Sequence, residues 1–515
     1  MKRTLLFFLL CAVASAYTYS QTNYVGKRIY LKKVAGNNTV GVDPSFNYHA
    51  GDTLVLTAAQ NPYSWAWFTN INNVTIINEG GQVVLNWFDN GAIQGGFAFD
   101  GCKHIHLTGT GTPGVKYGFL ITTPANRGVG VNVFGRSSNI EVDHCEMYNK
   151  ASGFWIKEEV QCADSLSFPN WVLNYFKIHD NYIHNCTLEA MYLGSTDPNN
   201  FAGTDSSQHP VVYCANGKPT NHKPMRLGNF HIYNNIIDST GRGGIQLSSA
   251  DIGHNEINNN TITNVGYEFN GWQGNGIAIG GYTHAYVHDN VVDNTFATGI
   301  FSLGAGTVKI VRNKVNHSGM LAGRTISECA SIMIDTRNTT NPSPGKPNPE
   351  MLTFKVKDNI LGTNTDYNVK VWSTYFTFTK DNAICNNVTF SGAPASHYVN
   401  YGVYWKGECD TGRLNTKNYV QQHATAETLN PQNSSPNIFP NPASDVVTVT
   451  LNDKISGKII LNIYDAQGKL IQTKNTYKNS SQLQQTFNVK SLSPGVYNLQ
   501  IATETEKTNL KFIKQ

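Results

Sequence analysis

One pattern of apolar and polar residues recurs along much of the chain: an apolar residue, two usually polar residues, asparagine, a variable residue and another apolar residue. The clearest copies carry Asn181, Asn235, Asn260, Asn290, Asn313 and Asn359. These asparagines are 54, 25, 30, 23 and 46 residues apart, so a unit of about 23 residues repeats, with insertions in some copies. A repeat of this length predicts stacked supersecondary units. An asparagine at each turn can bond its own backbone and the units above and below.

Each repeat predicts three short strands. Apolar and polar residues alternate before the asparagine, as in Phe230 to Ile232, and a brief apolar pair follows it, as in Ile236 and Ile237. A further strand comes next and often opens with glycine, as in the segment that starts at Gly244. No segment longer than a turn or two has apolar residues at helical spacing. The pattern therefore predicts an all-β solenoid with three strands in each coil.

These repeats resemble the right-handed parallel β-helix family, the pectate-lyase-like solenoids. The resemblance runs from Val74 to Asn382. It implies the fold but leaves the chemistry open, because this scaffold carries lyases, hydrolases, epimerases, phage tailspikes and adhesins. Residues 21–410 are accordingly predicted to form the β-helix, and the polar residues 411–436 a linker.

The start of the chain predicts export. Residues 1–20 combine a positive start, a short apolar centre and small residues at a cleavage site, which is typical of a secretory signal peptide cut after Ala16 or Ser20. No apolar segment approaches the ~20 residues that a membrane-spanning helix needs, so we expect no transmembrane segment.

The last residues, 437–515, predict a small Ig-like β-sandwich with alternating strands and short turns. Motifs that begin at Pro440, Asp465, Gly495 and Lys511 resemble the type A C-terminal sorting domain of the type IX secretion system of Bacteroidetes. The resemblance implies the type IX machinery as a partner. It also implies a protein that is released or attached to the cell surface, usually after removal of this domain.

The overall charge narrows the class of partner. Charged residues make up 14% of the chain, and the net charge is only +4. A charge this small does not predict a polyanionic partner, and the sequence has no basic stripe or recognition motif for nucleic acid. We expect a monomer that handles neutral or weakly charged polar ligands.

The cysteines suit an oxidising compartment. Eight remain after signal cleavage, and an even number permits disulfides in an exported protein. Cys162 and Cys214 lie in the two largest insertions and form one predicted pair; Cys385 and Cys409 close the last repeat and form the other. Cys145 takes the asparagine position of its own repeat, so we expect a buried free thiol there.

After each asparagine turn and the short loop beyond it comes another strand. This strand is expected to form the floor of a substrate groove, as is usual in the β-helix family. Alternation turns Trp155, Tyr192 and Gln246 outward on one stacked face, and the two aromatic rings suit the flat faces of sugars. Insertions concentrate at the end of these strands opposite the short entering loop, and long loops on one edge of a solenoid commonly wall a cleft. Alternatively, the insertions cover the rings. The same face is expected to present Lys157, Ser248, Met333 and Asp335.

Charged residues near this face fit β-elimination on a uronate, in which a base removes the proton α to the carboxylate and a cation neutralises that carboxylate. Lys157 would be the base, and Arg242 the neutralising cation or the acid. Glu189 joins them as a third candidate catalytic residue. Ca²⁺ is the candidate cofactor, with Glu158, Glu159 or Glu189 as ligands. Taken singly, each of these residues is better explained as a solvated surface charge.

The leading hypothesis is therefore a secreted carbohydrate-active enzyme, a lyase that cleaves an acidic polysaccharide. A glycoside hydrolase is less favoured, because two carboxylates must flank one bond and Glu189 lies several coils from Asp335. The third hypothesis is a non-catalytic glycan-binding protein or adhesin that uses the same groove.

The histidines leave two interpretations open. His254 and His284 hold equivalent positions in neighbouring repeats and would form a metal or acid/base pair, or simply a stacked polar turn, which we favour. His104 and His106 lie on one face of an early strand and by themselves predict no role.

Overall fold

The computed structural model of this protein describes residues 25–399 and 437–514, apart from short gaps and longer ones at 87–95, 163–169, 197–224, 336–352 and 373–382. These residues are nearly all β, with 3-10 turns at Ala58–Gln60 (η1) and Leu321–Gly323 (η3). Contacts divide the chain into two compact units, residues 1–423 and 424–515. Among the described residues, no helix has the length and hydropathy to span a membrane.

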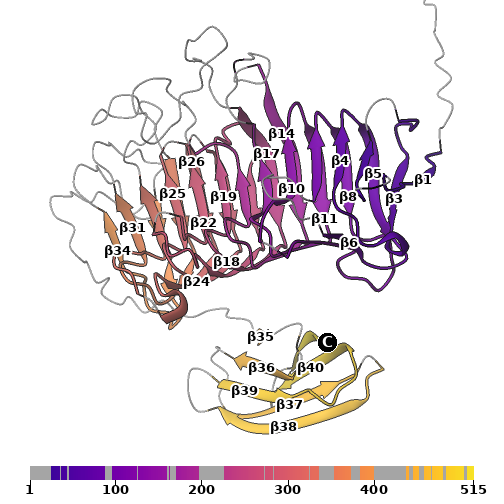
Figure 1. The fold of residues 1–515 in the computed structure, drawn as a ribbon. Coiled ribbons are helices and arrows are strands. Elements are labelled where there is room, and N and C mark those ends of the chain that lie inside the picture. Colours follow the sequence, from indigo (N-terminus) through magenta and orange to yellow (C-terminus); the bar gives the residue numbers. More distant parts are fainter. Residues whose placement is uncertain are drawn as a thin grey trace, which may run out of the picture. The chain divides into compact units, whose positions relative to one another are not determined.

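The first unit is a right-handed parallel β-helix built from three sheets (Figure 1). Sheet A contains β1 (Arg28–Tyr30), β3 (Thr53–Thr57), β5 (Asn72–Glu79), β8 (Lys103–Thr108), β11 (Ser138–Asp143), β14 (Val172–His179), β17 (Arg226–Tyr233), β20 (Glu256–Asn258), β23 (Ala285–His288), β26 (Thr307–Val311), β29 (Thr353–Lys357) and β32 (Ala383–Cys385). Sheet B contains β2 (Val40–Val42), β4 (Ala66–Thr69), β7 (Phe97–Asp100), β10 (Val129–Phe134), β13 (Ser152–Ile156), β16 (Met191–Leu193), β19 (Ile245–Ser248), β22 (Ile277–Gly280), β25 (Ile300–Leu303), β28 (Ile332–Asp335), β31 (Val369–Trp372) and β34 (His397–Val399). Sheet C contains β6 (Val83–Asn86), β9 (Phe119–Thr122), β12 (Cys145–Tyr148), β15 (Tyr182–His184), β18 (Ile236–Thr240), β21 (Thr261–Val265), β24 (Val291–Thr295), β27 (Lys314–Ser318), β30 (Ile360–Leu361) and β33 (Val388–Thr389).

Neighbouring strands in each sheet come from successive coils and pair in parallel, so the sequence advances steadily along the solenoid, as the colours of Figure 1 show. The inward residues of the alternating pattern form one apolar core that runs from Leu31 to Val399. Phe176 of β14, for example, pairs with Phe230 of β17, and their rings stack 4.6 Å apart. Burying each such side chain contributes about 1.5–3 kcal/mol. The predicted all-β solenoid is thus confirmed.

The six asparagines of the repeat stack in one column at the turn between sheets A and C, as the pattern predicts. Asn235 is representative, since its side-chain amide donates to Asn260 Oδ1 at 2.9 Å and to the Ile178 carbonyl at 2.8 Å. The same side-chain contact links each member to the next, and Asn359 continues the column to Asn387 at 2.8 Å. Asn387 escapes the sequence pattern because polar Thr389 stands where the second apolar residue should be.

The cysteines agree with part of the sequence interpretation. Cys145 is a buried free thiol, and its backbone N–H donates to Asn181 Oδ1 at 3.1 Å, so it occupies the first position of the column. Cys162 and Cys385 each take part in a disulfide bond. Their expected partners, Cys214 and Cys409, lie outside the described residues, so both pairings stay predictions.

The second unit contains two antiparallel sheets around a core of its own, which fits the predicted small sandwich. One sheet contains β35 (Asn437–Phe439), β36 (Val446–Leu451) and β39 (Leu483–Asn488). The other contains β38 (Leu470–Lys478), β37 (Gly457–Tyr464), β40 (Gly495–Ala502) and β41 (Lys507–Lys514). The predicted signal peptide and linker lie outside the described residues.

Candidate functional site

The outer face of sheet A carries a groove that the sequence interpretation did not anticipate. Five strands in a row have a left-handed residue at the same level, and these residues are Asn73, His104, Asn139, Tyr175 and Asn229, with φ between 52° and 63°. A left-handed residue bends a strand in the manner of a β-bulge, and bulges often re-aim side chains beside functional sites. Because the bends stand in one column, they line a continuous hollow.

This hollow, which we name the sheet A groove, has a volume of about 580 Å³. It extends from Gly51, just before β3, to His254, just before β20. Six strand spacings of about 4.8 Å separate these ends, so the groove is roughly 29 Å long. Its polar lining residues include Asn73, His104, His106, Asn139, Glu141, Tyr175, Lys177, Asn229, His231 and His254.

A buried carboxylate fixes one histidine on the floor of the groove. His106 Nε2 lies 2.5 Å from Asp143 Oδ2, and Asp143 also receives hydrogen bonds from Thr108 and His144. Burial favours a raised pKa for Asp143, but these hydrogen bonds outweigh it and lower that pKa. The hydrogen bond to Asp143 in turn raises the pKa of His106. His106 keeps 41% of its side chain exposed, and Nδ1 is the ring nitrogen that can face a ligand.

A lysine lies beside this pair. Lys177 Nζ is 3.1 Å from Glu141 Oε2, and His179 Nε2 is 3.0 Å from Glu141 Oε1. Burial favours a raised pKa for Glu141, but the hydrogen bonds from His179 and Lys177 outweigh it and lower that pKa. Glu141 also has an oxygen within 4.8 Å of the ligand atoms of His106 and Asp143. His106 and Lys177 therefore both lie close to the ionised carboxylate of Glu141.

The sequence-predicted aromatic residues do gather on sheet B. The rings of Trp155 and Tyr192 lie 4.6 Å apart, and Lys157 Nζ is 5.2 and 4.7 Å from their centroids. Gln246 follows Tyr192 in register and donates to Thr196 Oγ1 at 2.7 Å. These residues form an aromatic and cationic surface, which we name the sheet B platform.

Glu189 and Arg242 do not join the sheet B platform. They precede β16 and β19, whereas Lys157 follows β13. The pair therefore lies at the N-terminal ends of the sheet B strands, and the lysine lies at their C-terminal ends. Five residues of strand, about 16 Å, separate the two levels. Arg242 instead forms an ion pair with Glu268 and lies 3.7 Å from Glu189, whose pKa is raised by burial. The expected meeting of these groups with Lys157 is not found.

Several other expectations need correction. Ser248 and Asp335 are buried rather than exposed on the sheet B face, and Met333 is half-buried. Glu158 accepts a hydrogen bond from the Gly135 backbone at 2.7 Å, which engages one oxygen of the proposed Ca²⁺ ligand. Glu159 lies outside the described residues, and the Ca²⁺ requirement stays a prediction.

His254 and His284, for which two interpretations were open, contact different groups. His284 Nδ1 accepts a hydrogen bond from the Thr307 backbone at 2.9 Å. The His254 ring lies edge-on to His231, 5.9 Å between centroids. The sequence does carry a signal for the polar residues of the sheet A groove. Each of four residues stands two positions before the last residue of its alternating segment: His106, Glu141, His231 and Glu256.

The three parallel sheets define the class of the first unit, a parallel β-helix protein. Residues 437–515 match the family described as the secretion system C-terminal sorting domain. The sorting domain indicates that this bacterial protein is secreted or attached to the cell surface through type IX secretion. A comparison with curated protein sequences finds no match.

Solved structures with a similar chain path include several β-helix proteins. The mannuronan C-5 epimerase AlgE6 A-module of Azotobacter vinelandii is 12% identical, with a TM-score of 0.32 over 68% of this chain and 90% of that chain. The DFA-IIIase of Arthrobacter chlorophenolicus is 10% identical, with a TM-score of 0.36 over 69% and 84%. The tailspike of E. coli bacteriophage HK620 is 10% identical, with a TM-score of 0.31 over 96% and 88%.

Proposed function

We propose that this exported protein is a carbohydrate-active enzyme that cleaves an acidic polysaccharide by β-elimination in the sheet A groove. One observation carries the proposal: an oriented histidine, a lysine and a strained tyrosine line the same elongated hollow. A groove roughly 29 Å long suits a chain of sugars better than a small metabolite, because it crosses six strand spacings.

The residues fit the three tasks of elimination. His106, held by Asp143, is the base that removes the proton α to the uronate carboxylate. Lys177 supplies the positive charge that stabilises the carboxylate as charge builds up on it. Tyr175, on the same strand as Lys177, donates its hydroxyl proton to the leaving glycosidic oxygen. The C–O bond at the β carbon breaks as the new carbon–carbon double bond forms, so protons and electrons balance.

Hydrolysis fits the groove less well. The carboxylates of Glu141 and Glu256 are three strand spacings apart, about 14 Å, which exceeds the ~6.5–9.5 Å that inverting enzymes need. Asp143 is close to Glu141, but it is buried and ionised and already accepts hydrogen bonds from three side chains. An ionised, fully engaged carboxylate is a poor general acid.

A second function, glycan binding without turnover, is supported by the sheet B platform. The neighbouring rings of Trp155 and Tyr192 offer apolar faces to sugar rings, and Lys157 adds a positive charge for an acidic sugar. In an enzyme, the same platform would be a second contact for the polymer, on sheet B. Arg242 and Glu189 have no catalytic role in this proposal; they belong to a group of ion-paired residues before β16 and β19.

The test is a panel of alginate, pectate and glycosaminoglycans, with the ultraviolet absorbance of the unsaturated uronide as the readout. We expect absorbance to rise on one polymer class, and His106→Ala and Lys177→Ala each to lower the rate at least about 100-fold. Trp155→Ala is the matched comparison, since it should raise KM and leave kcat nearly unchanged.

Two outcomes would overturn this assignment. Polymer binding without any unsaturated product would favour the glycan-binding function. Loss of turnover in Lys157→Ala, with His106→Ala fully active, would move the chemistry to sheet B.

A further inference from the structure

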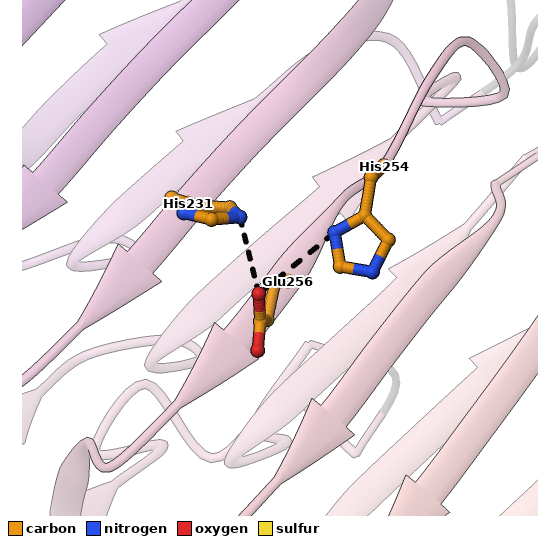
Figure 2. A group of neighbouring side chains, drawn as sticks. All are labelled: His231, His254 and Glu256. Carbon is orange, nitrogen blue, oxygen red and sulfur yellow. Dashed lines mark ion pairs between the residues drawn. The ribbon is translucent and has the colours of Figure 1, made fainter.

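Beyond the groove floor, we infer that His231, His254 and Glu256 bind a divalent transition-metal ion of the Zn²⁺ class. The three residues lie at the far end of the sheet A groove, and their ligand atoms are all within 4.8 Å of one another. Figure 2 shows the Glu256 carboxylate between the two imidazoles. The inference does not depend on the proposed lyase activity.

The spacing of the ligand atoms suits a tetrahedral ion. Zn²⁺ lies about 2.0–2.2 Å from nitrogen and oxygen ligands, so two ligands of one tetrahedral ion are about 3.4 Å apart. His231 Nε2 is 3.1 Å from Glu256 Oε2, and His254 Nδ1 is 3.8 Å from the same oxygen. Both values lie close to the edge length of a tetrahedral site, and all three ligand atoms lie within 4.8 Å of one another.

The fold positions each ligand from a different place. His231 projects from β17, and Glu256 is its direct partner in register on β20. His254 precedes β20, where its backbone N–H donates to Asn229 Oδ1 at 3.0 Å. The neighbouring Gly253 has φ 64°, which turns the chain at this point. The ligands therefore come from two adjacent strands and one fixed turn.

A second line of evidence is the hydrogen bonding behind Glu256. Its other oxygen, Oε1, contacts His288 Nε2, and His288 Nδ1 lies 2.6 Å from Asp289 Oδ2. Arg312 in turn holds Asp289 at 2.6 Å. Ligands of catalytic metal sites are commonly oriented by such outer hydrogen bonds. This series of hydrogen bonds fixes the Glu256 carboxylate so that Oε2 faces His231 and His254.

The ligand set indicates the kind of ion. Two imidazoles with one carboxylate match the three-ligand sites of catalytic zinc, which keep a position open for water or substrate. The side chains of His231 and His254 are 45% and 64% exposed, so an ion there would be reached from the groove. Ca²⁺ and Mg²⁺ prefer oxygen ligands, and we expect neither at this site.

The test is calorimetric titration of the untagged, chelator-treated full chain with Zn²⁺, and with Co²⁺ as a spectroscopic probe. We expect one saturable site and the visible absorption of tetrahedral Co²⁺. His231→Ala and His254→Ala should each weaken binding at least about 10-fold, as should Glu256→Gln. Circular dichroism melting of each variant separates a lost ligand from a lost fold.

His317→Ala is the matched control, because His317 is also an exposed histidine beside a carboxylate, 2.7 Å from Asp293. It lies on β27 of sheet C and should leave Zn²⁺ affinity unchanged. Equal affinity in the wild-type chain and in folded His231→Ala would overturn the inference, as would an equal loss in His317→Ala. Because the readout is metal binding, the result stands whether or not the polymer is cleaved.

Discussion

At Tyr175 a bulky aromatic residue adopts the left-handed backbone conformation that asparagine or histidine adopts in the neighbouring coils. Asparagine tolerates this conformation, whereas for most other residues it costs about 1–2 kcal/mol. Tyr175 is also 55% exposed and lines the groove, so burial of its ring does not explain its presence. Strain of this kind often marks a functional position. The tyrosine hydroxyl is the group that asparagine cannot supply.

Tyr175→Asn should therefore stabilise the fold and impair the enzyme. Relief of the left-handed strain should raise the free energy of unfolding by about 1 kcal/mol. Loss of the hydroxyl should lower the elimination rate about 100-fold or more. Urea unfolding and the uronide absorbance measure the two effects.

Tyr175→Phe is the matched variant, because it keeps the ring and the strain but removes the hydroxyl. It should lose activity without gaining stability. Full activity in Tyr175→Phe would contradict the role of the hydroxyl.

The pair of His106 and Asp143 predicts a specific pH dependence. As a base, His106 must be neutral, and Asp143 raises its pKa above the ordinary value of ~6.5, so activity should rise with pH through that raised pKa. Asp143→Asn should move this rise to lower pH, as a pH–rate profile would show. An unchanged profile would exclude His106 as the base.

The same pair affects stability in two pH windows. The stability that comes from the raised pKa of His106 is complete below ~6.5 and is lost as pH rises through the pKa of the folded state. The stability that comes from the lowered pKa of Asp143 is present above ~3.9 and is lost as pH falls through the folded-state pKa.

Among the elements, the asparagine turns should be the most sensitive to substitution. Asn260→Ala removes the side-chain bonds to Asn290 and to the Ile232 carbonyl, and takes from Asn235 its acceptor. Leaving buried groups unpaired should cost on the order of 3 kcal/mol in unfolding free energy. Asn258→Ala, two residues away and half-buried, is the control and should cost less than about 1 kcal/mol. Equal losses in a urea titration would contradict this account of the column.

The sequence predicts elements and turns well because their signals are local. Alternation in a segment such as Phe230 to Ile232 identifies the inward face, and the recurring asparagine identifies the turn. The groove depends instead on register: His106 and Asp143 lie on adjacent strands, 37 residues apart. A left-handed bend at Tyr175 has no clear local signal, since tyrosine seldom adopts it. The aromatic residues of the sequence therefore favour sheet B, whereas the hollow lies over sheet A.

For the whole molecule, the two compact units predict separable roles. Removal of residues 437–515 should leave the β-helix folded, because its apolar core is separate from that of the sandwich. The truncated protein should stay inside the cell envelope, since it lacks the domain that directs type IX secretion. Fractionation of the producing bacterium with immunodetection measures this directly. Secretion of the truncated chain at the wild-type level would contradict it.

The column of asparagine side chains also has a direction. Every hydrogen bond between two side chains of the column, from Asn181 to Asn359, runs from the amide N–H of one coil to Oδ1 of the following coil. A duplicated coil spliced anywhere into this series would meet a matching donor on one side and a matching acceptor on the other. Gene duplication can therefore lengthen the β-helix and its outer surface by about 4.8 Å per coil, without leaving two donors or two acceptors opposite each other.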